Sequence, residues 1–142
     1  MLTASDLMTI QPLVTTPTAS LGEVMRYMQA DAIRHMPVVD ESYNLVGIIT
    51  DRDVRLAMNS ERLQSPDMNQ QILMETPAAD IMTTAVMTVD PSTPAFEVAE
   101  SLSTFKFDAM PVVDNKQLVG IVTTTDILDR FAQMERSKVV AA

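Results

Sequence analysis

The polar side chains best placed to do chemistry form a Thr-x-x-Asp element that occurs twice, as Thr50–Asp53 and as Thr123–Asp126. Each element follows an apolar run and opens a predicted helix. A threonine at that position caps free N–H groups, and an acid in the first turn complements the helix dipole. The same helix start attracts anions, and an aspartate there accepts hydrogen bonds from a ribose diol. Spacing alone leaves capping and ligand binding open, and it favours capping because capping is common.

Residues for catalysis are scarce. The chain has one histidine, three glycines and no cysteine. These counts exclude a thiolate zinc site, a cysteine nucleophile, His-rich metal sites and most His-based triads. Paired carboxylates such as Asp51 and Asp53 are present, but no nucleophile, metal-ligand cluster or glycine-rich phosphate loop accompanies them. We therefore expect no catalytic residue, no bound metal and no enzyme activity, and ATP hydrolysis would contradict this expectation.

Composition and charge narrow the class of protein. The chain has 142 residues, of which 46% are hydrophobic and 20% charged, as in packed globular proteins. Its 10 basic and 19 acidic side chains give a net charge of −9, which disfavours binding to nucleic acid or to an anionic membrane surface. No apolar run reaches the roughly 18 residues that a membrane span needs, and the first residues lack a signal-peptide layout. We expect a cytoplasmic protein with neither membrane nor nucleic acid as a partner.

The elements that must position the Thr-x-x-Asp motifs are themselves repeated. Three further motifs occur twice: DLMT at Asp6 and DIMT at Asp80, MPVVD at Met36 and Met110, and LVGI at Leu45 and Leu118. The first two pairs are 74 residues apart, and the third is 73 apart. A turn of variable length between MPVVD and LVGI explains the difference. We interpret the chain as a duplication.

Each copy predicts the order strand, helix, strand, turn, strand, helix. The first strands are expected near residues 13–16 and 86–89. The helix after each strand carries apolar residues at helical spacing: Leu21, Val24, Met25, Met28 and Ala32, then Ala95, Val98, Ala99, Leu102 and Phe105. Ser20 and Glu23 predict a capping box, whereas the second copy predicts Thr93 as the cap and Pro94 as the first helical residue.

The MPVVD and LVGI runs are predicted to form buried hairpins, with Asp40 and Asp114 serving their turns. Gly47 and Gly120 inside the second strand of each hairpin indicate a close backbone approach or a bulge. The helices opened by the Thr-x-x-Asp elements are predicted to bury a further apolar set: Val54, Ala57, Met58, Ile127, Leu128, Phe131 and Met134. The twelve methionines are expected to fill the core. Residues 61–77 are predicted to be a linker with one helical turn around residues 70–74, and residues 137–142 a tail.

The order of these motifs, found in two copies from about Ala4 to Met134, resembles the tandem CBS domain, named for cystathionine beta-synthase. The resemblance implies an α/β (α+β) fold in which two βαββα repeats pack through their sheets about a pseudo-twofold axis. The repeats would be residues 1–60 and 78–136. It looks most like the stand-alone prokaryotic regulatory type, including proteins similar to acetoin-utilisation regulators.

The resemblance implies a sensor that binds an adenosine ligand and requires no cofactor. The expected ligands are AMP, ADP, ATP or a related adenosyl compound such as S-adenosylmethionine. Binding would favour one orientation of the repeats and so regulate an unknown effector protein. The expected assembly is a homodimer that presents four repeats in a disc. The alternative is a structural dimerisation module without a ligand, in which Thr-x-x-Asp only caps helices.

The resemblance also implies two clefts, each combining an aspartate from one repeat with strand residues from the other. The main cleft would contain Pro12, Leu13, Val14, Ile33, Arg34, His35, Pro37, Ile121, Thr123, Thr125 and Asp126. The second, weaker cleft would contain Ile48, Thr50, Arg52, Asp53, Val86, Met87, Phe107, Ala109 and Pro111.

Charge distinguishes the two predicted clefts. In the main cleft Arg34 and His35 would meet a phosphate, whereas Asp108 holds the matching position of the second cleft, offset only by Arg52. We hypothesise that the cleft with Asp126 and Arg34 binds phosphorylated nucleotide tightly. Two alternatives stay open: His35 packs inside the protein, and Arg34 pairs with a nearby acid such as Asp31.

Overall fold

The computed structural model describes residues 1–58 and 66–141, which form two compact units. One unit is Leu13–Val86, and the other joins Met1–Pro12 to Met87–Ala142. The two units therefore do not coincide with the two sequence repeats, because the first segment of each repeat belongs to the unit built mainly from the other. Residues 59–65, which include the start of the predicted linker, and residue 142 of the predicted tail lie outside the described residues.

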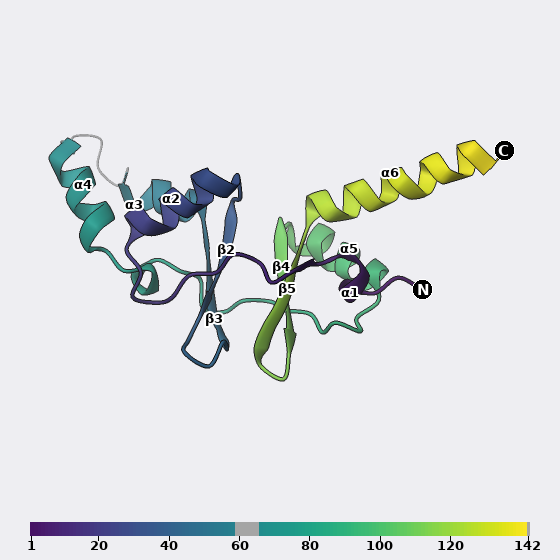
Figure 1. The fold of residues 1–142 in the computed structure, drawn as a ribbon, viewed down its shortest axis with the longest axis horizontal. Coiled ribbons are helices and arrows are strands. Elements are labelled where there is room, and N and C mark those ends of the chain that lie inside the picture. Colours follow the sequence, from purple (N-terminus) through teal and green to yellow (C-terminus); the bar gives the residue numbers. More distant parts are fainter. Residues whose placement is uncertain (59–65, 142) are drawn as a thin grey trace. The chain divides into compact units, whose positions relative to one another are not determined.

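The Leu13–Val86 unit consists of one hairpin and the helices around it (Figure 1). Its elements are α2 (Leu21–Asp31), β2 (His35–Val39), β3 (Leu45–Thr50), α3 (Asp51–Met58), α4 (Pro66–Glu75) and the 3-10 helix η1 (Ala78–Asp80). Strands β2 and β3 pair antiparallel. The core contains the buried side chains of both strands and of the inner helix faces: Leu21, Val24, Met28, Met36, Val38, Ile49, Val54 and Ala78.

The second unit has the same plan with one more strand. Its elements are α1 (Ala4–Leu7), β1 (Thr9–Ile10), α5 (Ala95–Phe105), β4 (Ala109–Asp114), β5 (Gln117–Thr123) and α6 (Thr124–Ala141). The strand order is β1-β5-β4, with both pairs antiparallel. Its core is Ala4, Leu7, Val98, Leu102, Met110, Val112 and Val122. The predicted mixed α/β architecture and the hairpins are confirmed.

We call the first segment of each repeat the exchanged segment, because it belongs to the unit built mainly from the other repeat. In both units a methionine of the exchanged segment lies against a glycine of the hairpin. A Cβ added to Gly120 would lie 2.5 Å from Met8 Sδ and 3.0 Å from the Thr9 carbonyl oxygen. In the other unit a Cβ on Gly47 would lie 2.6 Å from Met82 Sδ. Both glycines also adjoin a register shift in their hairpin. Close approach and bulge were both predicted for these glycines, and both occur.

The predicted first strands are mostly extended loop. Residues 13–16 contain only one bridge, in which Thr15 N donates to Pro37 O (3.0 Å) and Val39 N donates to Thr15 O (2.9 Å). Val89 makes the same parallel bridge to Val112. In each unit, one residue of the predicted strand, Thr15 or Val89, therefore forms a bridge where a whole paired strand was expected. The short strand β1, which the motifs did not predict, instead pairs with β5.

The turn and cap predictions are partly confirmed. Asp40 Oδ1 accepts hydrogen bonds from Ser42 N and Asn44 N, both 2.9 Å, and Ser20 Oγ accepts from Glu23 N (3.2 Å). The prediction for α5 was wrong, because Pro94 is the N-cap rather than the first helical residue. Thr93 Oγ1 accepts from Asp90 N instead, and so closes the turn before the helix.

Two segments are more helical than predicted. Helix α4 covers ten residues where one turn was expected, and Ile72 and Leu73 pack on the core. A Cβ on Gly22 would lie 3.2 Å from the Leu73 carbonyl oxygen, so glycine allows α4 to approach α2 closely. The predicted tail is also helical, because α6 continues to Ala141.

The burial predicted for α6 was wrong in part. Ile127 packs against the core, but Leu128, Phe131 and Met134 are 61%, 61% and 49% exposed. Phe105 of α5 is 51% exposed as well. An apolar stripe at helical spacing faces away from this unit's own core, because α6 runs beyond the strands that would cover it (Figure 1).

Candidate functional site

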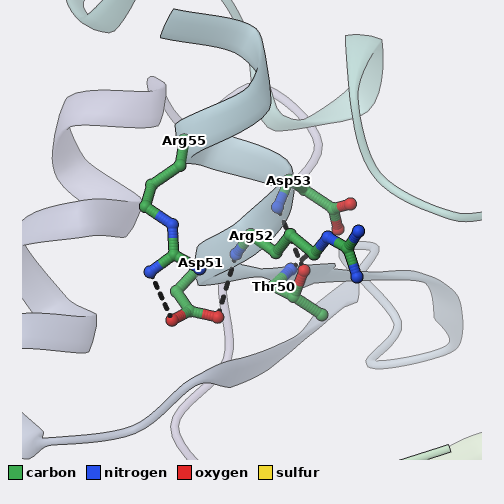
Figure 2. Close-up of polar contacts among 5 residues, drawn as sticks. All are labelled: Thr50, Asp51, Arg52, Asp53 and Arg55. Carbon is green, nitrogen blue, oxygen red and sulfur yellow. Dashed lines mark hydrogen bonds and ion pairs between the residues drawn. The ribbon is translucent and has the colours of Figure 1, made fainter. Parts of the chain in front are cut away.

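Thr50 and Asp53 form a reciprocal capping box between β3 and α3 (Figure 2). Thr50 N donates to Asp53 Oδ2 (2.9 Å), and Asp53 N donates to Thr50 Oγ1 (3.1 Å). Both side chains are half-buried. Strand β3 ends on the threonine and α3 begins at the next residue, so the sequence fixes the position of the carboxylate at the start of the helix.

Thr123 and Asp126 form the same box between β5 and α6. Thr123 N donates to Asp126 Oδ2 (2.8 Å), and Asp126 N donates to Thr123 Oγ1 (3.2 Å). The capping interpretation of both Thr-x-x-Asp elements is therefore correct, with two backbone N–H donors satisfied at each helix start.

Capping uses only half of each carboxylate. Within the described part of the chain, Oδ1 of Asp53 and Oδ1 of Asp126 accept no hydrogen bond. An ionised carboxylate accepts several hydrogen bonds, so each aspartate keeps a free acceptor at a helix N-terminus. Capping and ligand binding are thus compatible, and the cap orients the side chain that would bind.

Arg34 and His35 lie beside the first capping box. His35 is the register partner of Thr50, and Asp51 N donates to the Arg34 carbonyl oxygen (3.0 Å). The predicted grouping placed these two residues opposite Asp126. Within the Leu13–Val86 unit, backbone contacts join these two residues to the start of α3, because the residue before a hairpin's first strand faces the residue after its second. Their place in a cleft with Asp126 stays a prediction.

The second unit repeats this arrangement with different side chains. Ala109 is the register partner of Thr123, and Thr124 N donates to the Asp108 carbonyl oxygen (2.9 Å). The Thr124 hydroxyl donates to the Phe107 carbonyl oxygen (3.4 Å). Phe107, Asp108 and Ala109 are thus joined through their backbone atoms to the start of α6, and their place in the cleft of Asp53 stays a prediction.

Each exchanged segment lies alongside the strand that ends at the capping box of the other repeat. In the first of these contacts, Thr9 and Ile10 pair with Ile121 and Gly120 of β5, and Pro12 follows directly. In the Leu13–Val86 unit, Thr83 N and Ile48 O are 2.9 Å apart, and Val86 comes three residues later. Pro12 thus lies in the unit of Asp126, and Val86 in the unit of Asp53.

The remaining predicted site residues have varied environments. Pro37, Pro111 and Ile121 are buried, and Leu13 and Ile33 pack partly against the core of the Leu13–Val86 unit. Val14 and Ile48 are half-buried, and Met87 and Thr125 are exposed. Leu13 and Val14 belong to the unit of Asp53, and Met87 to the unit of Asp126.

The arginines near Asp53 differ in their partners. Figure 2 shows Arg55 turned toward Asp51, with Nη1 and Oδ2 3.3 Å apart, and Arg52 extended toward the Asp53 carboxylate. The side chains of Arg55 and Asp51 are 62% and 37% exposed, so solvent screens this pair and it contributes little stability. Among residues 1–58 and 66–141, neither Arg34 nor Arg52 forms an ion pair. The pairing of Arg34 with Asp31 that was left open does not occur.

The sequence did not predict a stacked pair of aromatic rings in this region. The rings of Phe105 and Phe107 are stacked, with centroids 5.9 Å apart and planes at 21°, and both are more than two-fifths exposed. Because Phe105 was predicted to be buried in the core, its position two residues before Phe107 did not indicate a stacked pair of rings. Lys106 between them adopts a left-handed conformation that ends α5 and turns the chain back.

Among residues 1–58 and 66–141, the structure contains neither a metal-ligand group nor a membrane-spanning helix. No group of three or more His, Cys, Asp or Glu side chains there is arranged to hold a metal ion. No helix in that part of the chain combines the length and apolar character needed to cross a bilayer.

The family model of the CBS domain matches the chain twice, over residues 4–60 and 78–133. The chain belongs to the CBS domain family. A CBS domain-containing protein of Dictyostelium discoideum is 36% identical over 114 residues, which are 78% of this chain and 77% of that protein. Two further curated relatives are longer, and the chain covers 22% and 61% of their lengths.

Three solved CBS-domain structures share the fold over nearly the whole chain. The AcuB protein of Vibrio cholerae has a TM-score of 0.84 at 30% identity, with 97% of this chain and 96% of AcuB covered. CBSX2 in complex with AMP has a TM-score of 0.81 at 26% identity, with coverages of 94% and 98%. The CBS domain pair of MJ0100, in complex with 5-methylthioadenosine and S-adenosyl-L-methionine, has a TM-score of 0.76 at 30% identity, with coverages of 94% and 98%. Pairs of CBS domains similar to this one thus bind adenosine ligands.

Proposed function

We propose that this chain is a regulatory module that binds an adenosine nucleotide or a related adenosyl ligand. The observation that carries the proposal is that, among the described residues, Oδ1 of Asp53 and Oδ1 of Asp126 accept no hydrogen bond, while a capping box holds each carboxylate at a helix N-terminus. A ribose diol donates two hydrogen bonds, and an oriented carboxylate accepts them without first losing side-chain entropy. The adenosine ligands bound by CBSX2 and by MJ0100 support the same ligand class.

Each proposed site is built on one capping box and its exchanged segment. The Asp53 site comprises Thr50, Ile48, Arg34 and His35, with the segment that ends at Val86 alongside β3. The Asp126 site comprises Thr123, Ile121, Phe107 and Asp108, with the segment that ends at Pro12 alongside β5. Apolar strand residues beside a polar helix start suit a base and a ribose, respectively.

Regulation would follow from a population shift. A ligand that contacts both repeats favours the arrangement in which those contacts form, and its effect is limited by its differential affinity for the two arrangements. We propose that this change is read by an effector protein or by a second copy of the chain.

The first test is a thermal shift assay with AMP, ATP, adenosine and S-adenosylmethionine. A ligand present at 100 times its Kd stabilises the folded state by about 2.7 kcal/mol, so the melting temperature should rise by several degrees with at least one of them. The purified chain should also yield a co-purified adenosyl compound by mass spectrometry. If none of the four compounds shifts the melting temperature at millimolar concentration, the ligand-free structural module is favoured.

The second part of the proposal is a homodimer. The apolar stripe of Leu128, Phe131 and Met134 is exposed on α6, and large exposed apolar patches mark interfaces. Phe131→Asp is expected to halve the mass measured by light scattering, because a carboxylate is costly to bury in such an interface. The melting temperature of the monomer should stay unchanged. Ser137→Asp, also on the exposed surface of α6, is the matched control and should leave the mass unchanged. A variant Phe131→Asp that keeps the mass of a dimer would show that the interface lies elsewhere.

A further inference from the structure

We infer that the two sites are selective for ligands of opposite charge: the Asp53 site for a phosphorylated nucleotide, and the Asp126 site for an adenosyl ligand without phosphate that carries a positive charge, such as a sulfonium. The inference rests on the proposed function and adds the ligand class of each site. It also reverses the assignment expected from the sequence.

The Asp53 site gathers cations. Arg34 is bound through its backbone to the residue after Thr50, and Arg52 lies between Thr50 and Asp53 in the box itself. Neither guanidinium has an ion-pair partner in the described part of the chain, and both side chains are exposed. The nearby acid Asp51 is already paired with Arg55. Arginine binds phosphate through charge-assisted and often bidentate hydrogen bonds, so this helix start suits a nucleotide phosphate.

The Asp126 site lacks those cations at the matching positions. Asp108 replaces Arg34, Ala109 replaces His35 and Thr125 replaces Arg52. Two other cations lie nearby, but the Arg130 guanidinium donates to the Asp6 carbonyl oxygen (3.2 Å), and Lys106 is placed at the end of α5. A phosphate here would approach two carboxylates, Asp108 and Asp126, and would be repelled.

Aromatic rings add to this preference. Phe107 is 43% exposed, is stacked on Phe105, and its carbonyl oxygen accepts from the Thr124 hydroxyl at the start of α6. The face of an aromatic ring attracts cations, and this attraction adds to that of nearby carboxylates. The matching residue in the other unit is Ile33, which has no ring. A sulfonium-bearing adenosyl ligand therefore suits the Asp126 site.

The test first removes the carboxylate of one site at a time, and then exchanges the charged residues of the site that remains. In Asp126→Asn protein, only the Asp53 site keeps its carboxylate, and calorimetry should show AMP binding at least 10-fold tighter than adenosine or S-adenosylmethionine. In Asp53→Asn protein, S-adenosylmethionine should bind at least 10-fold tighter than AMP. Adding R34D and R52T to the first variant should weaken AMP binding by about 30-fold and leave adenosine within about 3-fold, because only the phosphate contacts are lost. Adding D108R and T125R to the second should strengthen AMP binding.

The outcomes separate the two proposals. If the unaltered chain binds none of the three compounds, the proposed function fails. If it binds them but both single variants show the same order of affinities, or the order is reversed between them, the charge selectivity is wrong while the proposed function stands. Unchanged AMP affinity in the R34D/R52T variant would equally overturn the assignment of phosphate to the Asp53 site.

Discussion

Asparagine in place of Asp53 is expected to weaken AMP binding by about 100-fold and to leave the fold intact. An asparagine oxygen still accepts from Thr50 N, which lies 2.9 Å from Asp53 Oδ2, so the helix cap is retained. The negative charge that strengthens hydrogen bonds to a ribose diol is lost. Hydrogen bonds to charged groups contribute about 1.5–3 kcal/mol each, and about 2.7 kcal/mol corresponds to the expected 100-fold change. Titration calorimetry measures the affinity, and urea unfolding should show a free energy within about 0.5 kcal/mol of the parent.

Two matched variants control this experiment. Asp51→Asn removes a carboxylate from the same helix start, but one that pairs with Arg55 and lies outside the box, so AMP affinity should change by less than about 3-fold. Asp126→Asn changes the same position of the other unit and should spare AMP binding. Loss of AMP binding in Asp126→Asn alone would restore the assignment expected from the sequence and refute the present one.

Alanine in place of Gly120 is expected to destabilise the chain by about 2 kcal/mol. The new Cβ would lie 2.5 Å from Met8 Sδ, which a methionine side chain avoids by moving, but also 3.0 Å from the Thr9 carbonyl oxygen, which is fixed by pairing of β1 with β5. Forcing an extra carbon into such a contact costs about 1–3 kcal/mol. Urea unfolding followed by circular dichroism measures the loss.

A double-mutant cycle identifies the contact responsible. Met8→Ala in the Gly120→Ala background should recover part of the stability, giving a coupling above about 0.5 kcal/mol, whereas the clash with the Thr9 carbonyl remains. Gly47→Ala with Met82→Ala repeats the cycle in the other unit, where the corresponding distance is 2.6 Å. Gly22→Ala is the milder control, because its nearest atom is 3.2 Å away and alanine favours the helix. A Gly120→Ala protein as stable as the parent would show that the exchanged segment is displaced at no cost.

Sequence patterns predicted correctly those elements whose stabilising contacts lie close together along the chain. The apolar runs at Met36 and Leu45, separated by a turn with Asp40, could only bury themselves as a hairpin, and they do. The Thr-x-x-Asp elements predicted both helix starts, because a box of two side chains and two N–H groups is complete within four residues. The glycines predicted close approach because a strand interior otherwise disfavours them.

Predictions that depended on what covers a surface were less successful. The stripe that includes Phe131 has the spacing of a buried face, but spacing cannot say whether this chain or another covers it. The segment at Thr15 has the β-branched composition of a strand, yet only Thr15 itself forms a bridge, to Val38.

By itself, the sequence determined the duplication, the hairpins, the capped helix starts and the family. Only the tertiary structure decided which segment completes which hairpin and that the backbone of Arg34 contacts the start of α3. The DLMT and DIMT segments each carry a methionine at the same motif position, and either methionine could lie against either Gly47 or Gly120. The motifs alone therefore cannot say which segment pairs with which hairpin. Arg34 and Asp51 are far apart along the chain but joined across an antiparallel hairpin, because pairing brings the residue before one strand to the end of the next. From that contact we propose the phosphate site at Asp53 rather than at Asp126.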